Sequence, residues 1–169
     1  FFTDTANYQV CLTASNSIGS TKLCKDDYVV IEYPTNSNKI ENVICEDLRS
    51  GRDSGVVYDP GGKDKNYPDK NALCQFVIDV CDAENIEIFV PNAEYGLGTS
   101  DFLRIYDGPD VTGKLLFQGG NNQALGGDKN FVAESGKATV EFQSNTFTSG
   151  KGFALYWKTN YRNDGPINA

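Results

Sequence analysis

The pattern of a β-strand is clear in Ser100-Asp-Phe-Leu-Arg-Ile-Tyr-Asp-Gly108, around which the rest of the chain is interpreted. Its large side chains alternate, with Leu103 and Ile105 on one side and Phe102, Arg104 and Tyr106 on the other. This period of two predicts a β-strand whose apolar side packs against a second sheet. The turn residues Asp107-Gly108-Pro109 end the strand, and Asp101 stands at its entrance.

Further strands of similar length surround this one, and turn residues separate them. We expect strands at 74–80, 86–90, 102–106, 114–117, 137–143 and 152–158. Short strands at such spacing predict an all-β protein, an antiparallel jelly-roll-like β-sandwich, and no stretch longer than a turn has helical period. The expected core is Phe76, Ile78, Ile86, Ile88, Leu103, Ile105, Val140, Phe142, Phe153 and Leu155.

Composition excludes several classes of function. The 169 residues carry a net charge of −8 and no visible basic stripe, which argues against nucleic acid as a partner. No apolar run approaches the roughly 20 residues that span a bilayer, so membrane insertion is not expected. The chain has no His, the commonest general base, and no spacing singles out a pair of carboxylates. We therefore expect no catalytic activity.

Five cysteines in an acidic, turn-rich β-type sequence indicate an oxidising compartment. This cysteine usage predicts a secreted or cell-surface location. Cys11 and Cys24 stand almost symmetrically about the turn Ser15-Asn-Ser-Ile-Gly19 within a predicted hairpin at residues 7–33, so a cross-strand disulfide between them is geometrically reasonable. The alternative is a free pair that faces by chance.

The hairpin resembles the last two strands of a PKD domain, an immunoglobulin-like β-sandwich of secreted proteins. The resemblance rests on Tyr8-Gln-Val-Cys-Leu-Thr-Ala-Ser-Asn-Ser-Ile-Gly19 and Tyr28-Val-Val-Ile31. Two strands do not make a stable sandwich, so other strands, from the same polypeptide or from another chain, are expected to pair with them. We assign residues 1–33 to this partial domain and the polar, Pro-containing residues 34–44 to a linker.

Residues 45–160 resemble a CUB domain, a β-sandwich of extracellular proteins. Four features carry the resemblance in order: Cys45 with Cys74, Tyr67-Pro68, Asp101-Phe-Leu-Arg-Ile-Tyr-Asp-Gly108, and Phe142-Gln-Ser-Asn145 followed by Gly152-Phe-Ala-Leu-Tyr156. The opening Tyr58-Asp-Pro-Gly-Gly62 resembles the bacterial branch of the family, where CUB and PKD modules occur together. Residues 161–169 are assigned to a tail or a linker to a following segment.

The resemblance implies a disulfide between Cys45 and Cys74. The family's second disulfide would fall near Ser100 or Asp101 and near Gln118-Gly119, where this sequence has no Cys. Cys81 is extra. It is either a buried thiol, an intermolecular partner, or a competitor of Cys45 for Cys74, and the predicted pairing leaves it free.

The resemblance also implies a calcium ion at one end of the sandwich. The positions that match the family's ligands are Glu94, Asp101 and Asn145, and Tyr67 is expected to hydrogen-bond Glu94. Calcium prefers a shell of oxygens and tolerates an amide oxygen among them. The alternative for Asp101 is a cap for loop amides, and for Asn145 a turn residue.

Aromatic side chains on loops are the remaining candidates for ligand contact. Exposed rings are expected at Tyr58, Tyr67, Tyr95, Phe147 and Tyr161, of which Tyr67, Tyr95 and Phe147 are the predicted ligand-binding residues. In the family the calcium-bearing end often meets a basic side chain of the partner. We therefore expect an acidic, metal-ordered set of loops that receives a Lys or Arg.

The sequence thus predicts a non-catalytic, calcium-stabilised binding or adhesion module of a larger extracellular protein. Its expected partners are a protein or a glycan, together with neighbouring domains of the same polypeptide. Two alternatives stay open. One is a structural subunit of an extracellular filament that shares strands between chains, and the other is the accessory tail of a secreted protease or glycosidase.

Overall fold

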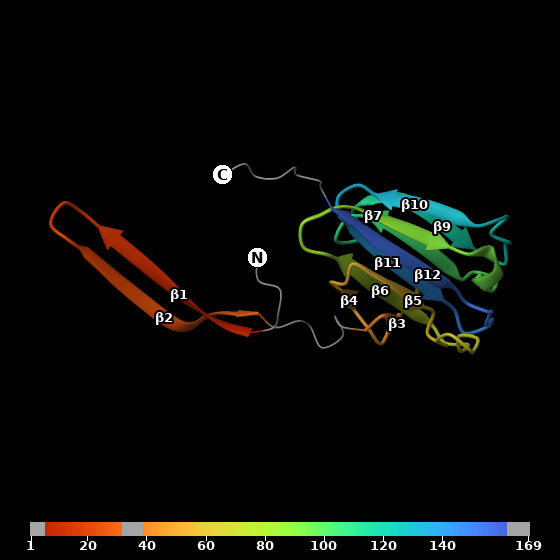
Figure 1. The fold of residues 1–169 in the computed structure, drawn as a ribbon. Coiled ribbons are helices and arrows are strands. Elements are labelled where there is room, and N and C mark those ends of the chain that lie inside the picture. Colours follow the sequence, from red (N-terminus) through yellow and green to blue (C-terminus); the bar gives the residue numbers. More distant parts are fainter. Residues whose placement is uncertain (1–5, 32–38, 162–169) are drawn as a thin grey trace. The chain divides into compact units, whose positions relative to one another are not determined.

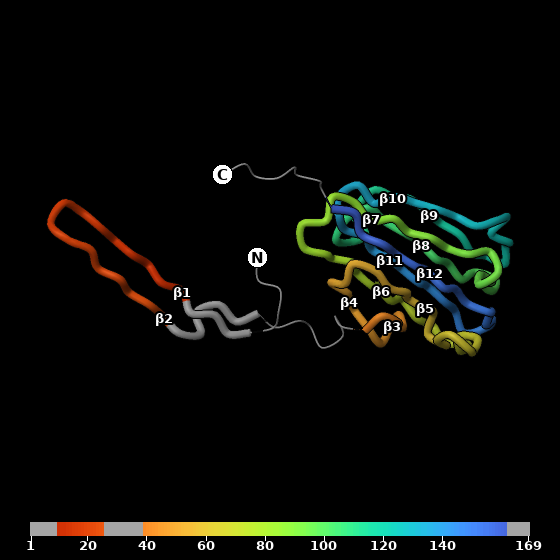
Figure 2. The backbone as a smooth tube through the Cα atoms, in the orientation of Figure 1, coloured from red at the N-terminus to blue at the C-terminus, as the bar shows by residue number. Residues whose placement is uncertain are grey.

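The computed structural model describes residues 6–31 and 39–161, with side chains at 10–25 and 39–161. The chain divides into two compact units, Phe1–Thr35 and Asn36–Ala169, drawn as a ribbon in Figure 1 and as a tube in Figure 2. Residues 1–5, 32–38 and 162–169 lie outside the described residues. They include parts of the predicted partial domain, linker and tail. We describe each unit by itself.

The described residues of the first unit form an antiparallel hairpin, as the sequence predicts. It is built from β1 (Ala6–Ser15) and β2 (Ser20–Ile31). The Asn16 side chain closes the turn, because its Oδ1 accepts hydrogen bonds from the backbone N–H groups of Ile18 and Gly19. Cys11 lies opposite Cys24, and the predicted disulfide joins them.

The second unit is a sandwich of two five-stranded sheets, which confirms the predicted fold class. The first sheet has the order β10-β7-β12-β5-β3, with β10 (Lys129–Ala133), β7 (Ala83–Val90), β12 (Ala154–Tyr161), β5 (Ser54–Tyr58) and β3 (Glu41–Val43). The second has the order β4-β6-β11-β8-β9, with β4 (Arg49–Ser50), β6 (Ala72–Asp79), β11 (Lys137–Ser144), β8 (Phe102–Asp107) and β9 (Lys114–Gly120).

The core lies between the two sheets and contains every residue that the sequence analysis assigns to it. Leu103 and Ile105 of β8 are both fully buried. The core also contains large residues that were not predicted, namely Ile44, Val57, Tyr67, Tyr95 and Trp157. Tyr67 and Trp157 were missed because each carries a polar group that needs a partner, and the structure supplies one to each.

Two stretches in which no strand was predicted form strands. Residues 41–43, assigned to the linker, pair in parallel with β5, and β5 itself is not among the strands predicted from the sequence. Gly55 weakens the strand pattern of β5, but a Cβ there would lie 2.5 Å from the Trp157 ring. This glycine therefore serves close packing of an indole against a strand.

The second predicted disulfide, between Cys45 and Cys74, is present. It ties the start of the sandwich to β6. Cys81 is free, as predicted, but it is exposed in the turn before β7, so the alternative of a buried thiol is wrong. The neighbouring Asp82 carboxylate raises the pKa of the Cys81 thiol. Within the described ranges, no helix is long and apolar enough to cross a membrane.

Candidate functional site at the Asp101 end of the sandwich

Asp101 is the centre of a buried polar cluster at the point where the chain enters β8. Its side chain is fully buried, and its backbone N–H donates to the carbonyl of Gly98. Its own carbonyl accepts from Asn121 N at 2.8 Å. Gly120 passes so close that a Cβ there would lie 2.0 Å from the Asp101 carbonyl oxygen. The end of β9 therefore packs closely against the backbone of Asp101.

Two residues from distant parts of the chain donate to the Asp101 carboxylate. The Tyr67 hydroxyl donates to Oδ2 at 2.6 Å. Asn145 donates to Oδ1 twice, from its backbone N at 2.9 Å and from its side-chain Nδ2 at 2.8 Å. Burial and then the bond to Asp101 raise the pKa of Tyr67, so its hydroxyl remains a donor at neutral pH.

Asn145 also shapes the loop that follows β11. Its Oδ1 accepts from the backbone N of Phe147 at 2.6 Å and of Thr148 at 3.1 Å. Its Nδ2 donates to the Thr99 carbonyl at 2.5 Å as well as to Asp101. One amide thus fixes its own loop and joins it to the loop before β8.

Glu94 takes a different partner from the one expected. It lies in the short 3₁₀ helix η1 (Asn92–Glu94) and accepts a hydrogen bond from the Tyr156 hydroxyl at 3.1 Å. The predicted bond between Tyr67 and Glu94 is wrong, because the Tyr67 hydroxyl donates to Asp101 and accepts from Gly98 N. Hydrogen bonds therefore join Asp101, Asn145 and Tyr67, but not Glu94.

The cluster, with the side chains in these positions, does not present the oxygen shell that calcium prefers. The Asn145 atom that faces Asp101 is a nitrogen, and its orientation is fixed by the two N–H groups that donate to Oδ1. In the part of the chain that the structure describes, no three Asp, Glu, Cys or His side chains are grouped to hold a metal. Calcium binding by Glu94, Asp101 and Asn145 stays a prediction.

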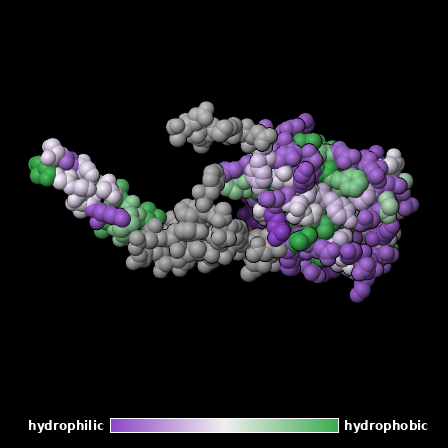
Figure 3. Space-filling view, in the orientation of Figure 1, coloured by the Kyte–Doolittle hydropathy of each residue, from purple (hydrophilic) through white to green (hydrophobic). Residues whose placement is uncertain are grey.

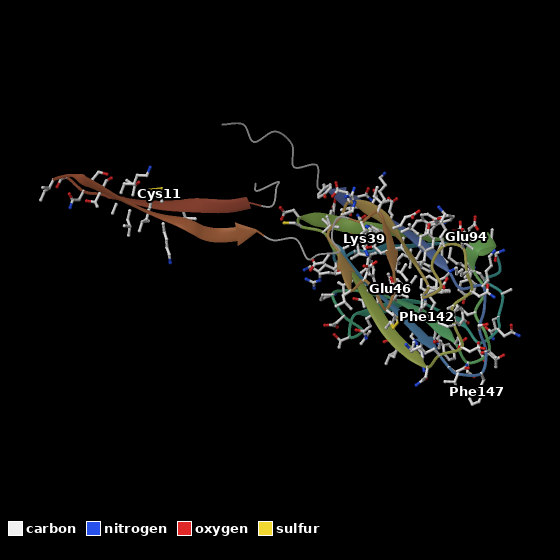
Figure 4. All side chains as sticks on the ribbon, turned by 90° about the horizontal axis from the view of Figure 1, so that it is seen from below. Cys11, Lys39, Glu46, Glu94, Phe142 and Phe147 are labelled. Carbon is white, nitrogen blue, oxygen red and sulfur yellow. A yellow bond between two sulfur atoms is a disulfide. The ribbon has the colours of Figure 1, made fainter. Side chains whose placement is uncertain are left out.

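The three aromatic residues predicted to contact a ligand differ in exposure. Tyr67 is 1% exposed and packs edge-on against Phe142, and Tyr95 is 9% exposed. Phe147 is 88% exposed, on the loop that Asn145 holds (Figure 4). A ligand at this end would therefore meet Phe147. Of the other two rings expected at the surface, Tyr58 is buried and Tyr161 is exposed.

A cavity of about 210 Å³ lies beside Glu94 and was not predicted from the sequence. Its lining includes Asp59, Tyr58, Lys63 and Lys151. Asp59 is 2% exposed and accepts from the backbone N–H groups of Gly61 and Phe153, yet burial raises the pKa of its carboxyl to about 6. The sequence signal was weak, because Asp59 precedes Pro60-Gly-Gly62 and looks like an ordinary turn residue.

A second hollow, of about 300 Å³, lies on the outer face of the sheet that contains β7, β10 and β12. Phe89 and Tyr156 stand side by side there, with ring centroids 6.3 Å apart, and Asn130 lies opposite Phe89 in the register. Exposed charged side chains, Glu87 and Lys158, border it. Aromatic rings beside an amide are suited to a ligand that has both apolar and hydroxyl groups.

These features describe a disulfide-linked β-sandwich with a closed polar cluster at one end. No family model matches the sequence. Cubilin from Sus scrofa is 30% identical over 108 residues, which are 61% of this chain and 3% of cubilin. The chain thus spans a small fraction of that relative.

Solved structures of CUB domains share the fold. The CUB1-EGF-CUB2 domains of rat MASP-1 match 67% of this chain and 42% of their own, with a TM-score of 0.55 and 14% identity. The MASP-1 CUB2 domain bound to Ca²⁺ matches 66% of this chain and 96% of its own, with a TM-score of 0.50 and 16% identity. The extracellular region of zebrafish Gpr126/Adgrg6 matches 74% of this chain and 15% of its own, with a TM-score of 0.51 and 18% identity. The sandwich therefore has the CUB-domain fold.

Proposed function

We propose that this chain is a non-catalytic binding module of a larger secreted or cell-surface protein, and that it contacts its partner through the loop that carries Phe147. The CUB-domain fold and the two disulfides support an extracellular role. The observation that carries the proposal is the 88% exposure of Phe147 on a loop fixed by two hydrogen bonds to Asn145 Oδ1.

A large aromatic ring in water is the kind of group that dominates binding when it enters a pocket of a partner. Because the Asn145 bonds already order the backbone on either side of Phe147, little conformational entropy is lost on binding. Thr146 and Ser149, both exposed, lie close to Phe147 in the sequence and carry small polar side chains. An apolar anchor with polar residues near it is typical of recognition sites.

The test is binding of the full chain to arrays of extracellular-matrix proteins and of glycans, compared with Phe147→Ala. We expect wild-type binding in one of the two arrays and a loss of about tenfold or more in affinity with the variant, the usual effect of removing an aromatic anchor. Leu115→Ala is the matched control, because Leu115 is an exposed apolar residue on β9. Binding that is absent, or equally strong in both variants, would contradict the proposal.

A glycan on the outer face of β7, β10 and β12 is the second candidate, supported by the adjacent Phe89 and Tyr156 rings and by Asn130. Sugar rings stack their C–H faces on aromatic side chains while amides bind their hydroxyls. In the same glycan array, Phe89→Ala would abolish binding at this face and Phe147→Ala would not. The opposite result would assign the glycan to the loop end.

We further propose that the hairpin is the C-terminal part of a PKD-like domain. Leu12 and Leu23 lie opposite each other in its register and are 70% and 73% exposed. Figure 3 shows hydrophobic surface on the described part of the hairpin. Such a face needs a covering layer, which strands of the same polypeptide or of another chain would supply. Strand sharing would also suit the alternative role as a filament subunit.

A further inference from the structure

The Asp101 carboxylate is a fully buried charge whose hydrogen-bond partners are all neutral. They are the Tyr67 hydroxyl and the backbone and side-chain amides of Asn145, which together make three hydrogen bonds. Both carboxylate oxygens therefore have hydrogen-bond donors, and neither is buried without a partner. Burial of this charge is therefore compensated within the chain.

The Asn145 amide nitrogen stands between two oxygens from the loop before β8. It is 2.8 Å from Asp101 Oδ1 and 2.5 Å from the Thr99 carbonyl oxygen. A carboxylate oxygen and a backbone carbonyl that converge on one point are the groups that ordinarily hold a calcium ion. Here the converging oxygens face the two N–H donors of an amide.

The orientation of this amide is determined by its other end. Oδ1 accepts from the backbone N–H groups of Phe147 and Thr148. Turning the amide over would set its NH₂ group against these two N–H donors and would set Oδ1 against the Asp101 carboxylate. Four hydrogen bonds would be lost, so the nitrogen stays toward Asp101.

We propose that the Asn145 side-chain amide takes the place of a divalent cation at this end of the sandwich, so that the loops before β8 and after β11 are ordered without metal. The NH₂ group donates one hydrogen bond to Asp101 Oδ1 and one to the Thr99 carbonyl oxygen, in the position where a cation would contact both oxygens. The same geometry makes Asn145→Asp a gain of function. That variant sets a second carboxylate against Asp101, and a calcium ion between them relieves the repulsion.

The experiment measures thermal unfolding of the full chain in millimolar calcium chloride and in chelator. The wild type unfolds at the same temperature in both. Asn145→Asp unfolds several degrees lower than wild type in chelator and recovers in calcium, as expected when a ligand binds only the folded state. Asn122→Asp is the matched control. It adds the same charge to the same end, on an exposed residue whose backbone N donates to Gly98, and it shows no calcium effect beyond that of the wild type.

Calorimetric titration of the wild type with calcium chloride is the second measurement, and it does not depend on whether a variant folds. The proposal predicts no saturable binding. One-site binding by the wild type, or a melting temperature that rises by several degrees in calcium, would overturn it and support the calcium set expected from the sequence. A folded Asn145→Asp variant that does not respond to calcium would also overturn it, because the amide would then not occupy a cation position.

Discussion

Tyr67 connects two loops to the core by hydrogen bonds and packing. Its hydroxyl donates to Asp101 Oδ2 and accepts from Gly98 N at 2.7 Å, while its ring packs against Phe142. We expect Tyr67→Phe to keep the packing but leave a buried carboxylate oxygen and a buried N–H each short of a partner. The loss of stability should be about 2–3 kcal/mol in urea unfolding.

The control for this substitution is Tyr106→Phe. Tyr106 is half-buried on β8, and its hydroxyl makes no hydrogen bond to a described residue. Its loss should change stability by less than about 0.5 kcal/mol. Equal effects of the two substitutions would show that the Tyr67 hydroxyl does not hold the cluster together.

Asp59 gives the sandwich a pH dependence of unusual sign. Burial raises the pKa of its carboxyl from 3.8 to about 6, so between these values the folded state binds more protons than the unfolded state. Its contribution is fully present below the unfolded pKa and is lost as the pH rises through about 6. Two pKa units correspond to roughly 2–3 kcal/mol.

The measurement is urea unfolding at a series of pH values for the wild type and for Asp59→Asn. The wild type should gain stability relative to the variant as the pH falls from about 7 to about 5, whatever the difference between them at neutral pH. Parallel curves would show that Asp59 does not titrate in this window.

We expect the stability of the first strands of the sandwich to depend on a disulfide bond. β3 and β4 have three and two residues, and the Cys45–Cys74 bridge lies between them and β6. For a sequence separation of 29 residues, the chain-entropy model gives about 3–4 kcal/mol of stabilisation. The double variant Cys45→Ala/Cys74→Ala should lose about this much in denaturant unfolding. A loss below about 1 kcal/mol would show that packing alone holds these strands.

The hairpin of β1 and β2 differs from the sandwich in how its amides are protected. Among its described residues two strands pair, and the apolar residues Leu12 and Leu23 are exposed. In hydrogen exchange on a verified monomer, amides at 10–25 should exchange quickly and those of β11 slowly. Equal protection of the two regions would mean that the hairpin is stable by itself and needs no covering strands.

The sequence predicted the inner strands better than the outer ones. β8, β11 and β12 have apolar alternation because each has one face in the core and a strand on both sides. β3 and β4 are too short for a period to be visible, and Gly55 interrupts the apolar pattern of β5 because it has no side chain. Their pairing depends on residues far along the chain, such as Trp157, which local patterns do not contain.

For the sandwich as a whole, the sequence predicted which loops meet at the candidate site but not which of their atoms face each other. Asp101 and Asn145 are 44 residues apart and come together as expected. Which end of the Asn145 amide faces Asp101 depends on two backbone N–H groups in its own loop, and no spacing in the sequence reveals that. The partner of Glu94 depends likewise on how β12 packs beside η1.

We infer that the chain's own hydrogen bonds order the loop presenting Phe147, so that it meets a partner without metal. Backbone ¹⁵N relaxation of the full chain in chelator tests this order. We expect order parameters of about 0.85 for residues 145–148, equal to those of β11, and no change on adding calcium. Values below about 0.6 in chelator that rise to the level of β11 in calcium would contradict it.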